Sequence, residues 1–574
     1  MNLPSLSKRL LPLVLICLTI DSQAQNPGKY WLFFADKGPH ELQQANLLKA
    51  QSALQPRARF RHKKLMPPPR TADETDLPVY AGYIEELQRL GCVIEWPSRW
   101  LNAVSARLSP EQLAVVSNLG FIVRVQPVGK RDRSRDPEIR QEDAPGVRKS
   151  ASSMDYGLSF DQNALIQVPS VHERGNNGDG VLIAVFDTGF RLNHECLDHL
   201  NVVAAYDFIN RDSNVDLDSL QDLNAQISHG TKVLSVLAGH APGSLIGPAY
   251  GASIALAKTE DVSSETAVEE DYYIAALEWA DSLGVDIVTS SLSYLDWYTY
   301  EDMDGDTAPI STAVDVAVKK GLVVVTAAGN EGMSDWRYIS APADADSVIA
   351  VGAVDRRGAI ASFSSYGPTF DGRLKPEVTA MGVGNICAQV PGPEGLSTAY
   401  TSGSGTSFAA PMAAGAAALL LAEVPELEPM QVRQALMETA TQNANPDNRY
   451  GCGIVQIDAA IDLARSWTNG CPLPDPAVPD DWQISGYPNP FVSGRQIMRI
   501  QVRNALAQSL RIEIYNLLGQ KIIRLWDGSH ASARSLQVYW DGRDAGGNCV
   551  QSGTYFCRVE GAGRLRIFPL TVVR

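Results

Sequence analysis

The sequence predicts an α/β fold in which helices flank a parallel sheet, with a small α+β unit before it and a β-sandwich after it. From residue 180 onward, apolar strand-like segments alternate with helical segments, which is typical of a parallel sheet covered on both faces. Residues 25–150 combine helices and strands within a short length, as a small α+β unit does. Residues 486–574 contain short strands separated by turns, a pattern that indicates a β-sandwich.

The first 24 residues have the features of a secretory signal peptide. Lys8 and Arg9 precede an apolar segment at 10–20, and the small residues at 22–24 suit a cleavage site. The apolar segment is shorter than the about 20 residues that a membrane-spanning helix needs. We therefore expect export of the protein and no transmembrane segment in the mature chain.

The unit at 25–150 has its own helix and strand signals. We expect a helix at 81–90, strands at 93–95 and 101–108, a helix at 110–120 and a strand at 121–125. The second helix has the clearest start, because Ser109 can serve as N-cap, Pro110 suits the first turn and Gln112 completes a capping box.

Charge separates this unit from the rest of the chain. The whole chain has a net charge of −16 and a pI near 5.0, which argues against nucleic acid or an anionic membrane as a partner. Residues 25–150 carry 20 Lys and Arg against 14 Asp and Glu, or +6, whereas residues 151–574 carry 27 against 50, or −23. Opposite signs favour docking of the first unit on the second. Residues 130–149, dense in Arg, Asp and Pro, are expected to form an exposed linker that a peptidase can cut.

A glycine-rich loop at 403–407 leads into an apolar, alanine-rich helix expected at 408–422. Its glycines allow backbone angles that other residues avoid. Ser407 would lie at the positive end of this helix beside unpaired N–H groups, which suits a nucleophile. We expect Pro411 early in the helix, where a missing N–H is not needed.

A nucleophilic serine needs a base and a group that orients the base. Asp187 ends an apolar segment that resembles a buried parallel strand, and His229 opens a helix. Asn330 follows a strand at 321–326, and its side-chain amide can donate to a developing oxyanion. Ligands on parallel sheets bind at the carboxyl ends of the strands, where Asp187 and Asn330 are both expected.

Four sequence windows resemble those of the subtilisin-like serine peptidases, the subtilases of the peptidase S8 family. The windows are Asp187-Thr188-Gly189, His229-Gly230-Thr231, Ala328-Gly329-Asn330 and Gly405-Thr406-Ser407-Phe408-Ala409-Ala410-Pro411. Their order along the chain also matches subtilisin. The resemblance covers residues 155–465 and implies a serine endopeptidase with Asp187, His229 and Ser407 as catalytic triad and Asn330 in the oxyanion hole.

The resemblance also implies where a polypeptide substrate would bind. In subtilases the edge that corresponds to Ser291-Leu292-Ser293 pairs with the substrate backbone and forms one wall of the specificity pocket, and Ala328 and Gly329 are expected at the same cleft. Ser293 stands where the family usually has glycine. A side chain there would narrow the pocket, so the family's substrate preference is not transferred to this chain.

Two further resemblances complete the domain organisation. The unit at 25–150 is similar to the inhibitor-type propeptide of subtilases, which implies a zymogen. The β-rich tail, which opens with Tyr487-Pro488-Asn489-Pro490-Phe491, resembles the C-terminal sorting modules of type IX secretion, related to the immunoglobulin-like domain of hook-capping proteins. A plain accessory β-sandwich is the alternative. The expected segments are a signal peptide at 1–24, the propeptide and its linker at 25–150, the catalytic domain at 151–466, a proline-rich linker at 467–485 and the sorting domain at 486–574.

No cofactor is expected for the chemistry, but structural Ca²⁺ is an option. Asp302, Asp304 and Asp306 concentrate carboxylates around a turn, and a solvated acidic loop is the alternative. Six cysteines remain outside the signal peptide and the propeptide, which allows 15 pairings. Cys549–Cys557 and Cys452–Cys471 are candidate bridges.

The sequence therefore indicates a serine endopeptidase that is secreted or held at the cell surface. Its expected partners are polypeptide substrates, its own propeptide and an outer-membrane secretion machinery. One alternative is a non-catalytic surface protein on a subtilase scaffold, although all four key residues are present. Another is an esterase that uses the same triad.

Overall fold

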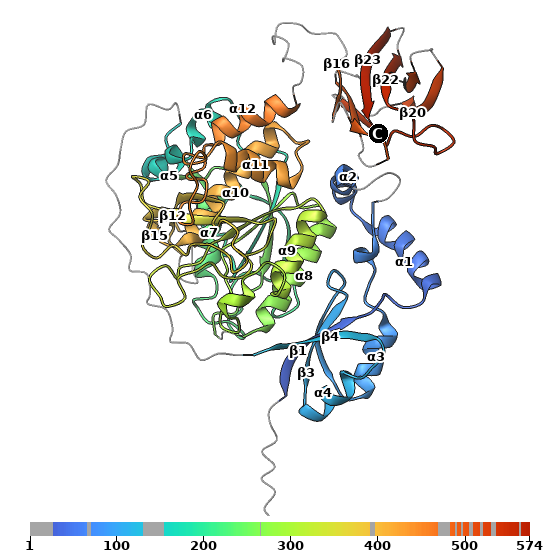
Figure 1. Ribbon diagram of the computed structural model, residues 1–574. Coiled ribbons are helices and arrows are strands. Elements are labelled where there is room, and N and C mark those ends of the chain that lie inside the picture. Colours follow the sequence, from blue (N-terminus) through green and yellow to red (C-terminus); the bar gives the residue numbers. More distant parts are fainter. Residues whose placement is uncertain are drawn as a thin grey trace, which may run out of the picture.

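The structure is a computed structural model that describes most of the chain. The described residues are 27–65, 71–129, 154–263, 266–390, 397–468, 483–487, 491–494, 498–503, 509–516, 520–529, 535–561 and 564–573. Figure 1 shows three folded parts in chain order: an N-terminal module, a large α/β domain and a C-terminal β-rich module. The predicted signal peptide lies outside the described residues.

A seven-stranded parallel sheet forms the centre of the large domain. Its strands, in spatial order, are β13 (Val378–Met381), β12 (Ile349–Val354), β11 (Val323–Ala327), β10 (Ile287–Ser290), β5 (Leu182–Asp187), β9 (Ser253–Lys258) and β6 (Asn201–Asp207). Every residue of the middle strands β5, β10 and β11 is buried, because both of their faces are covered. The predicted parallel sheet is confirmed.

Helices cover the two faces and enclose two separate hydrophobic cores. One core lies under α7 (Ser228–Ala238), α10 (Thr406–Glu423), α11 (Pro429–Glu438) and α12 (Ile457–Thr468), and the other under α8 (Val268–Leu283) and α9 (Pro309–Lys319). Side chains of β5 alternate between them: Ile183 and Val185 enter the first core, and Ala184 and Phe186 the second. Short helices α5 (Phe160–Leu165) and α6 (Val168–Glu173) complete the first side.

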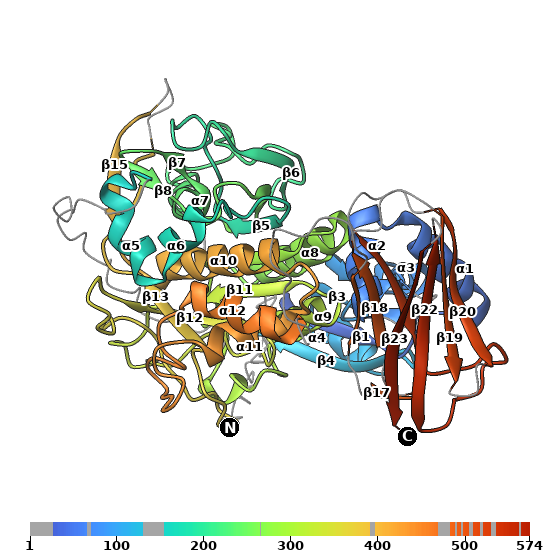
Figure 2. The same cartoon turned by 90° about the horizontal axis from the view of Figure 1, so that it is seen from above.

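Helix α10 runs through the middle of the domain (Figure 2). Its residues are buried from Thr406 to Leu421, as its uniformly apolar sequence predicts. By length and composition it is the one helix among the described residues that could cross a bilayer, but 89% of that window is buried inside the domain, so it is a core helix. It begins at Thr406, two residues before the predicted start. Pro411 is therefore the sixth residue, beyond the first four N–H groups that have no partner in a helix, and the prediction that its N–H is not needed was wrong.

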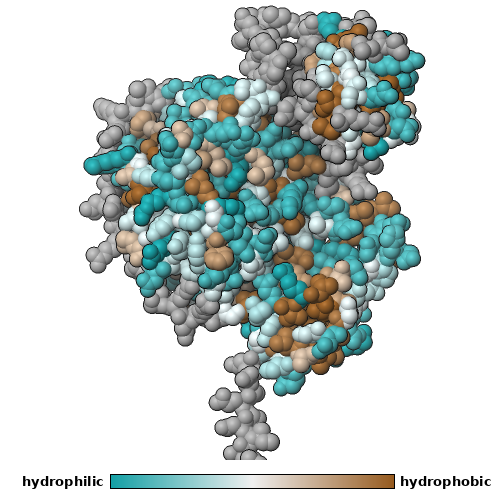
Figure 3. Space-filling model, in the orientation of Figure 1, coloured by the Kyte–Doolittle hydropathy of each residue, from teal (hydrophilic) through white to brown (hydrophobic). Residues whose placement is uncertain are grey.

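The N-terminal module is built on a four-stranded antiparallel sheet of order β2-β3-β1-β4. Its elements are β1 (Gly28–Phe34), α1 (His40–Ala53), α2 (Pro56–Leu65), α3 (Ala81–Arg89), β2 (Val93–Ser98), β3 (Ala103–Leu108), α4 (Pro110–Val116) and β4 (Ile122–Val128). The predicted capping box of Ser109 and Gln112 is present at α4. One face of the sheet places Trp31 and Phe33 in the core of α8 and α9, and Trp100 from the turn between β2 and β3 joins them. In Figure 3, apolar side chains gather on this module, while much of the large domain is hydrophilic.

The C-terminal module is a two-sheet β structure with its own core. A three-stranded sheet holds β16 (Gln483–Tyr487), β18 (Met498–Arg503) and β21 (Ser535–Trp540), and a five-stranded sheet holds β17 (Phe491–Val492), β23 (Arg564–Val573), β22 (Gly553–Gly561), β19 (Ser509–Asn516) and β20 (Lys521–Ser529). Buried side chains of both sheets, such as Ile500 and Ile512, share one cluster. The module begins at Gln483, before the predicted boundary at 486.

The predicted bridge between Cys549 and Cys557 is not formed, because the two side chains have different surroundings. Cys557 lies in β22 and is fully buried in the core of the module. Cys549 lies in the preceding turn opposite Arg543 and is partly exposed. Cys452 is a buried free cysteine, and its predicted partner Cys471 lies outside the described residues.

Candidate active site

The predicted site residues lie at the carboxyl ends of the strands of the parallel sheet and at the starts of two helices. Asp187 is the last residue of β5, and Asn330 follows the end of β11 by three residues. His229 is the second residue of α7, and Ser407 is the second residue of α10. Segments that are far apart in the sequence thus meet at one end of the sheet, where parallel sheets bind ligands.

Asp187 and His229 form a direct pair. The Oδ1 atom of the fully buried Asp187 lies 2.7 Å from Nδ1 of His229 and also accepts the backbone N–H of Thr188 at 2.8 Å. Gly230 permits this approach, since a Cβ there would lie 2.4 Å from the carbonyl oxygen of Gly189. With Nδ1 donating to the carboxylate, Nε2 of the neutral ring is left as the base.

The same pair sets the proton affinity of the imidazole. Burial by itself would lower the pKa of His229, because a charged ring is poorly solvated there. The charge of Asp187 and its hydrogen bond outweigh burial, and the pKa of His229 lies above the ordinary 6.5. The carboxylate therefore prepares the ring to hold a proton during a reaction.

Ser407 lies in the first turn of α10, beside a residue whose ring contacts His229. The ring of the next residue, Phe408, has its centroid 6.3 Å from that of His229. The Ser407 hydroxyl donates to the carbonyl oxygen of Ser291 at 3.3 Å. Among the described residues it makes no hydrogen bond to the histidine; in unliganded sites such contacts are often long and tighten only when substrate binds.

The carbonyl of Ser407 has an unusual partner. In a regular helix it would accept the N–H of the residue four positions later, which here is Pro411 and has none. The hydroxyl of Ser291 donates to this carbonyl instead, at 2.8 Å. Ser291 is thus linked to Ser407 in both directions. The position of Pro411 four residues after the serine was the sequence signal for this contact.

Asn330 is fixed with its amide group beside the serine. Its Oδ1 accepts the backbone N–H of Thr406 at 2.9 Å and the hydroxyl of Thr406 at 3.0 Å, so Nδ2 remains as a donor. A Cβ added to Gly405 would lie 3.7 Å from each of three atoms: Nδ2 and Oδ1 of Asn330 and the backbone nitrogen of Ser407. Both donors therefore border the space that the missing side chain of Gly405 leaves open. Such a space can hold an oxyanion.

Comparisons with known proteins decide the family. The subtilase family model matches residues 178–453. Subtilisin NAT of Bacillus subtilis subsp. natto is 34% identical over 333 residues, which cover 58% of this chain and 77% of that protein. Subtilisin DY of Bacillus licheniformis is 35% identical over 314 residues, covering 54% of this chain and 99% of that protein. The chain belongs to the subtilase family. It is a serine-type endopeptidase.

The N-terminal module of this subtilase is also recognised. The family model of the peptidase S8 propeptide domain of Bacteroidota matches residues 29–142. The predicted propeptide and the zymogen that it implies are thereby confirmed. A solved structure of a protease from Pseudoalteromonas arctica aligns with 55% of this chain over its own full length, at 24% sequence identity and a TM-score of 0.44.

The predicted substrate edge of the subtilase differs in exposure along its length. Ser293 is exposed, whereas Ser291 and Leu292 are buried. Ala328 is fully buried, and Gly329 donates its N–H to the hydroxyl of Thr406 at 3.3 Å. Ser293 is thus the residue of this set whose side chain is most open to a substrate.

The acidic turn at 301–306 uses its carboxylates locally. Asp302 accepts the N–H and the hydroxyl of Thr299, at 2.7 and 2.8 Å. Asp304 accepts the N–H groups of Asp306 and Thr307, at 3.0 and 2.7 Å. Among the described residues, no group of three or more His, Cys, Asp and Glu side chains is arranged to hold a metal ion. The carboxylates of Asp302 and Asp304 thus accept hydrogen bonds from neighbouring residues of the turn, and structural Ca²⁺ stays a prediction.

The Ser291 contact predicts a specific loss of catalysis. Ser291→Ala leaves the buried carbonyl of Ser407 without a donor, and a displacement of the nucleophile should lower kcat roughly 10-fold, about 1.4 kcal/mol, with little change in KM. Steady-state kinetics on a peptide substrate measure both constants. In the double variant Ser291→Ala/Pro411→Ala, the restored N–H of residue 411 should return most of kcat. A loss in the single variant that the double variant does not repair would contradict the role of this hydrogen bond.

Proposed function

We propose that this subtilase is a secreted endopeptidase that hydrolyses polypeptides through a Ser407 acyl-enzyme, with Asp187 and His229 completing the triad. The main support is the pairing of His229 Nδ1 with the buried Asp187 Oδ1 at 2.7 Å, next to the start of the helix that carries Ser407. This pairing leaves Nε2 as a base and raises the pKa of the ring.

The proposed reaction proceeds in two halves. Ser407 Oγ attacks the scissile carbonyl carbon and gives its proton to His229 Nε2, and the carbonyl oxygen becomes an oxyanion. Nδ2 of Asn330 and the backbone N–H of Ser407 donate to that oxyanion. The imidazolium then protonates the leaving amine, which breaks the C–N bond and leaves the acyl-enzyme. A water molecule repeats the sequence and releases the second product. No cofactor takes part.

The substrate would lie extended along residues 291–293, with Ala328 and Gly329 at the other side of the cleft. Backbone pairing at a strand edge does not depend on the substrate's side chains, so it suits polypeptides of varied sequence. The exposed side chain of Ser293 occupies space at this edge, and we infer that it restricts the specificity pocket.

Replacement of the nucleophile tests the proposal. Ser407→Ala should abolish hydrolysis of a denatured protein and should leave the precursor uncut, because maturation is expected to use the same serine. Gel electrophoresis of the purified precursor and a protease assay read the two effects. Full activity of the variant would remove Ser407 from the mechanism. Normal maturation of an inactive variant would assign the cut to another peptidase.

Export is the second part of the proposal. We infer that residues 1–24 direct the chain across the inner membrane and that the C-terminal module is a type IX sorting domain read by an outer-membrane machinery. The module has a hydrophobic core of its own, separate from those of the catalytic domain. It follows a segment rich in proline at 471–479. These features suit a signal that is recognised apart from the enzyme.

Truncation after Pro479 separates export from catalysis. The shortened chain lacks every strand of the C-terminal module and should fold and cleave peptides in vitro as the full chain does. In its native cell, a two-membrane bacterium, it should accumulate in the periplasm, as measured by fractionation with activity assays. Normal arrival of the truncated enzyme in the medium would make the module an accessory domain, and loss of folding in vitro would make it part of the enzyme.

A further inference from the structure

The propeptide contacts the catalytic domain at two places. Its sheet packs on the sides of α8 and α9, where Lys29 forms a buried ion pair with Asp271 at 2.6 Å. Helix α2 binds elsewhere, at the C-terminal ends of the same two helices. Its contacts include Gly180, Asp286 and Lys320, which precede β5, β10 and β11. This second contact lies at the amino edge of the sheet, opposite the edge that carries Asp187.

Two arginines of α2 bind backbone carbonyls at and near these helix ends. The last carbonyls of a helix have no partner within it and carry partial negative charge. Arg61 donates to the carbonyl oxygens of Asp281 at 3.0 Å, of Lys320 at 3.1 Å and of Val285. Arg57 donates to that of Gly284 at 3.1 Å and to that of Gly180 at 2.6 Å. The two guanidinium groups thus cap α8 and the segment after α9.

Ionised side chains from both partners are buried in this contact. Arg61 forms an ion pair with the fully buried Asp281, which His62 also contacts, with 2.7 Å between Nε2 and Oδ1. Lys320 of the catalytic domain is 2% exposed and pairs with Asp76 of the propeptide at 2.5 Å. Removal of one member of such a pair is costly because the other charge stays buried.

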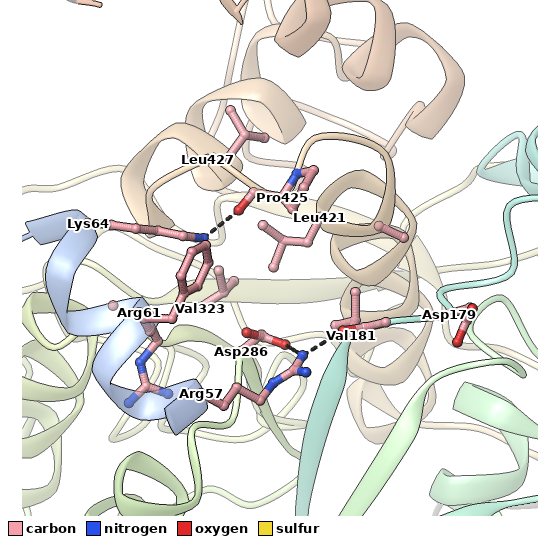
Figure 4. Close-up of a pocket in the computed structure, with 14 residues that line it drawn as sticks. Arg57, Arg61, Lys64, Asp179, Val181, Asp286, Val323, Leu421, Pro425 and Leu427 are labelled. Carbon is pink, nitrogen blue, oxygen red and sulfur yellow. Dashed lines mark hydrogen bonds and ion pairs between the residues drawn. The ribbon is translucent and has the colours of Figure 1, made fainter. Parts of the chain in front are cut away.

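The surfaces fit closely at the polar contacts and less closely elsewhere. A Cβ on Gly284 would lie 2.5 Å from the backbone nitrogen of Ala58, and one on Gly321 would lie 2.7 Å from Cγ of Arg61. Beside α2, however, a cavity of about 380 Å³ remains between the propeptide and apolar side chains of the catalytic domain. Figure 4 shows Arg57 and Lys64 reaching across it to Asp286 and Pro425. The polar groups, rather than a filled apolar core, define this contact.

We propose that α2 and residues 71–76 form a second anchor that keeps the propeptide bound after its covalent link to the enzyme is cut. The anchor lies away from the active site and retains the propeptide without entering the substrate cleft. The proposal rests on the maturation that the proposed function includes. It also explains the strongly basic sequence of α2, whose arginines are complementary to two helix C-termini and two aspartates.

The test measures release of the cut propeptide from an inactive chain. The full-length Ser407→Ala protein carries one inserted recognition site for an added protease within 130–153, is cut there after folding, and is diluted. Size-exclusion chromatography over time gives the dissociation rate. Arg57→Ala should speed release roughly 10-fold and Arg61→Ala roughly 100-fold or more. Arg59→Ala is the matched control on α2, since its guanidinium donates to Ser52 within the propeptide, and it should leave the rate unchanged.

A double-mutant cycle covers the case in which Arg61→Ala does not fold. Arg57 and Asp286 are both partly exposed, so Arg57→Ala and Asp286→Asn are mild changes. Each should speed release, and their combination should add little to the larger single effect. Release at the unmodified rate in Arg57→Ala and Asp286→Asn, or equally fast release in Arg59→Ala, would overturn the anchor. Because the chain is inactive and is cut by an added protease, either result leaves the proposed role of Ser407 to its own test.

Discussion

The position of the first turn of α10 is the constraint on which the rest of the site depends. Three neighbours hold this turn: Ser291 binds the carbonyl of Ser407, Asn330 binds both polar groups of Thr406, and the N–H of Gly405 donates to Gly382. Ser407, the proposed nucleophile, is therefore coupled through Thr406 to Asn330, the proposed second oxyanion donor. Such preorganisation is what electrostatic catalysis requires, since donors that are already in place need no reorganisation during the reaction.

The helices that flank the parallel sheet present opposite termini at the two ends of the domain. At the carboxyl edge, the N-terminus of α10 presents positive partial charge to Ser407 and to a developing oxyanion. At the amino edge, the C-termini of α8 and α9 present carbonyls, which the arginines of α2 bind. Under the proposed function and the proposed anchor, the same physical property of helices serves catalysis at one end and propeptide binding at the other.

Much of the fold and of the candidate site could be predicted from the sequence, wherever a local pattern indicated a single structure. The apolar segment before Asp187 and the windows around His229, Asn330 and Ser407 correctly predicted that these residues lie at the carboxyl ends of strands and at helix starts. Contacts between distant segments were not readable. Helices α1 and α2 were missed. Helix α2 is strongly basic and has no apolar face that would indicate burial. Its arginines pair with Asp281 and Asp286, which come from a distant part of the chain. Likewise, the sequence around Cys549 and Cys557 did not show that Cys549 lies opposite Arg543.

The pH dependence of kcat/KM tests the central claim, that Asp187 and His229 prepare Ser407, most directly. Only the neutral imidazole can accept the serine proton, so activity is present above the pKa of His229 and is lost as the pH falls through it. Asp187 raises that pKa, and the account predicts an acidic limb with its midpoint above pH 6.5. In Asp187→Asn the midpoint should move downward, because burial then dominates, and kcat should fall about 10⁴-fold. A midpoint below 6.5 in the unmodified enzyme, or one that Asp187→Asn leaves in place, would contradict the account.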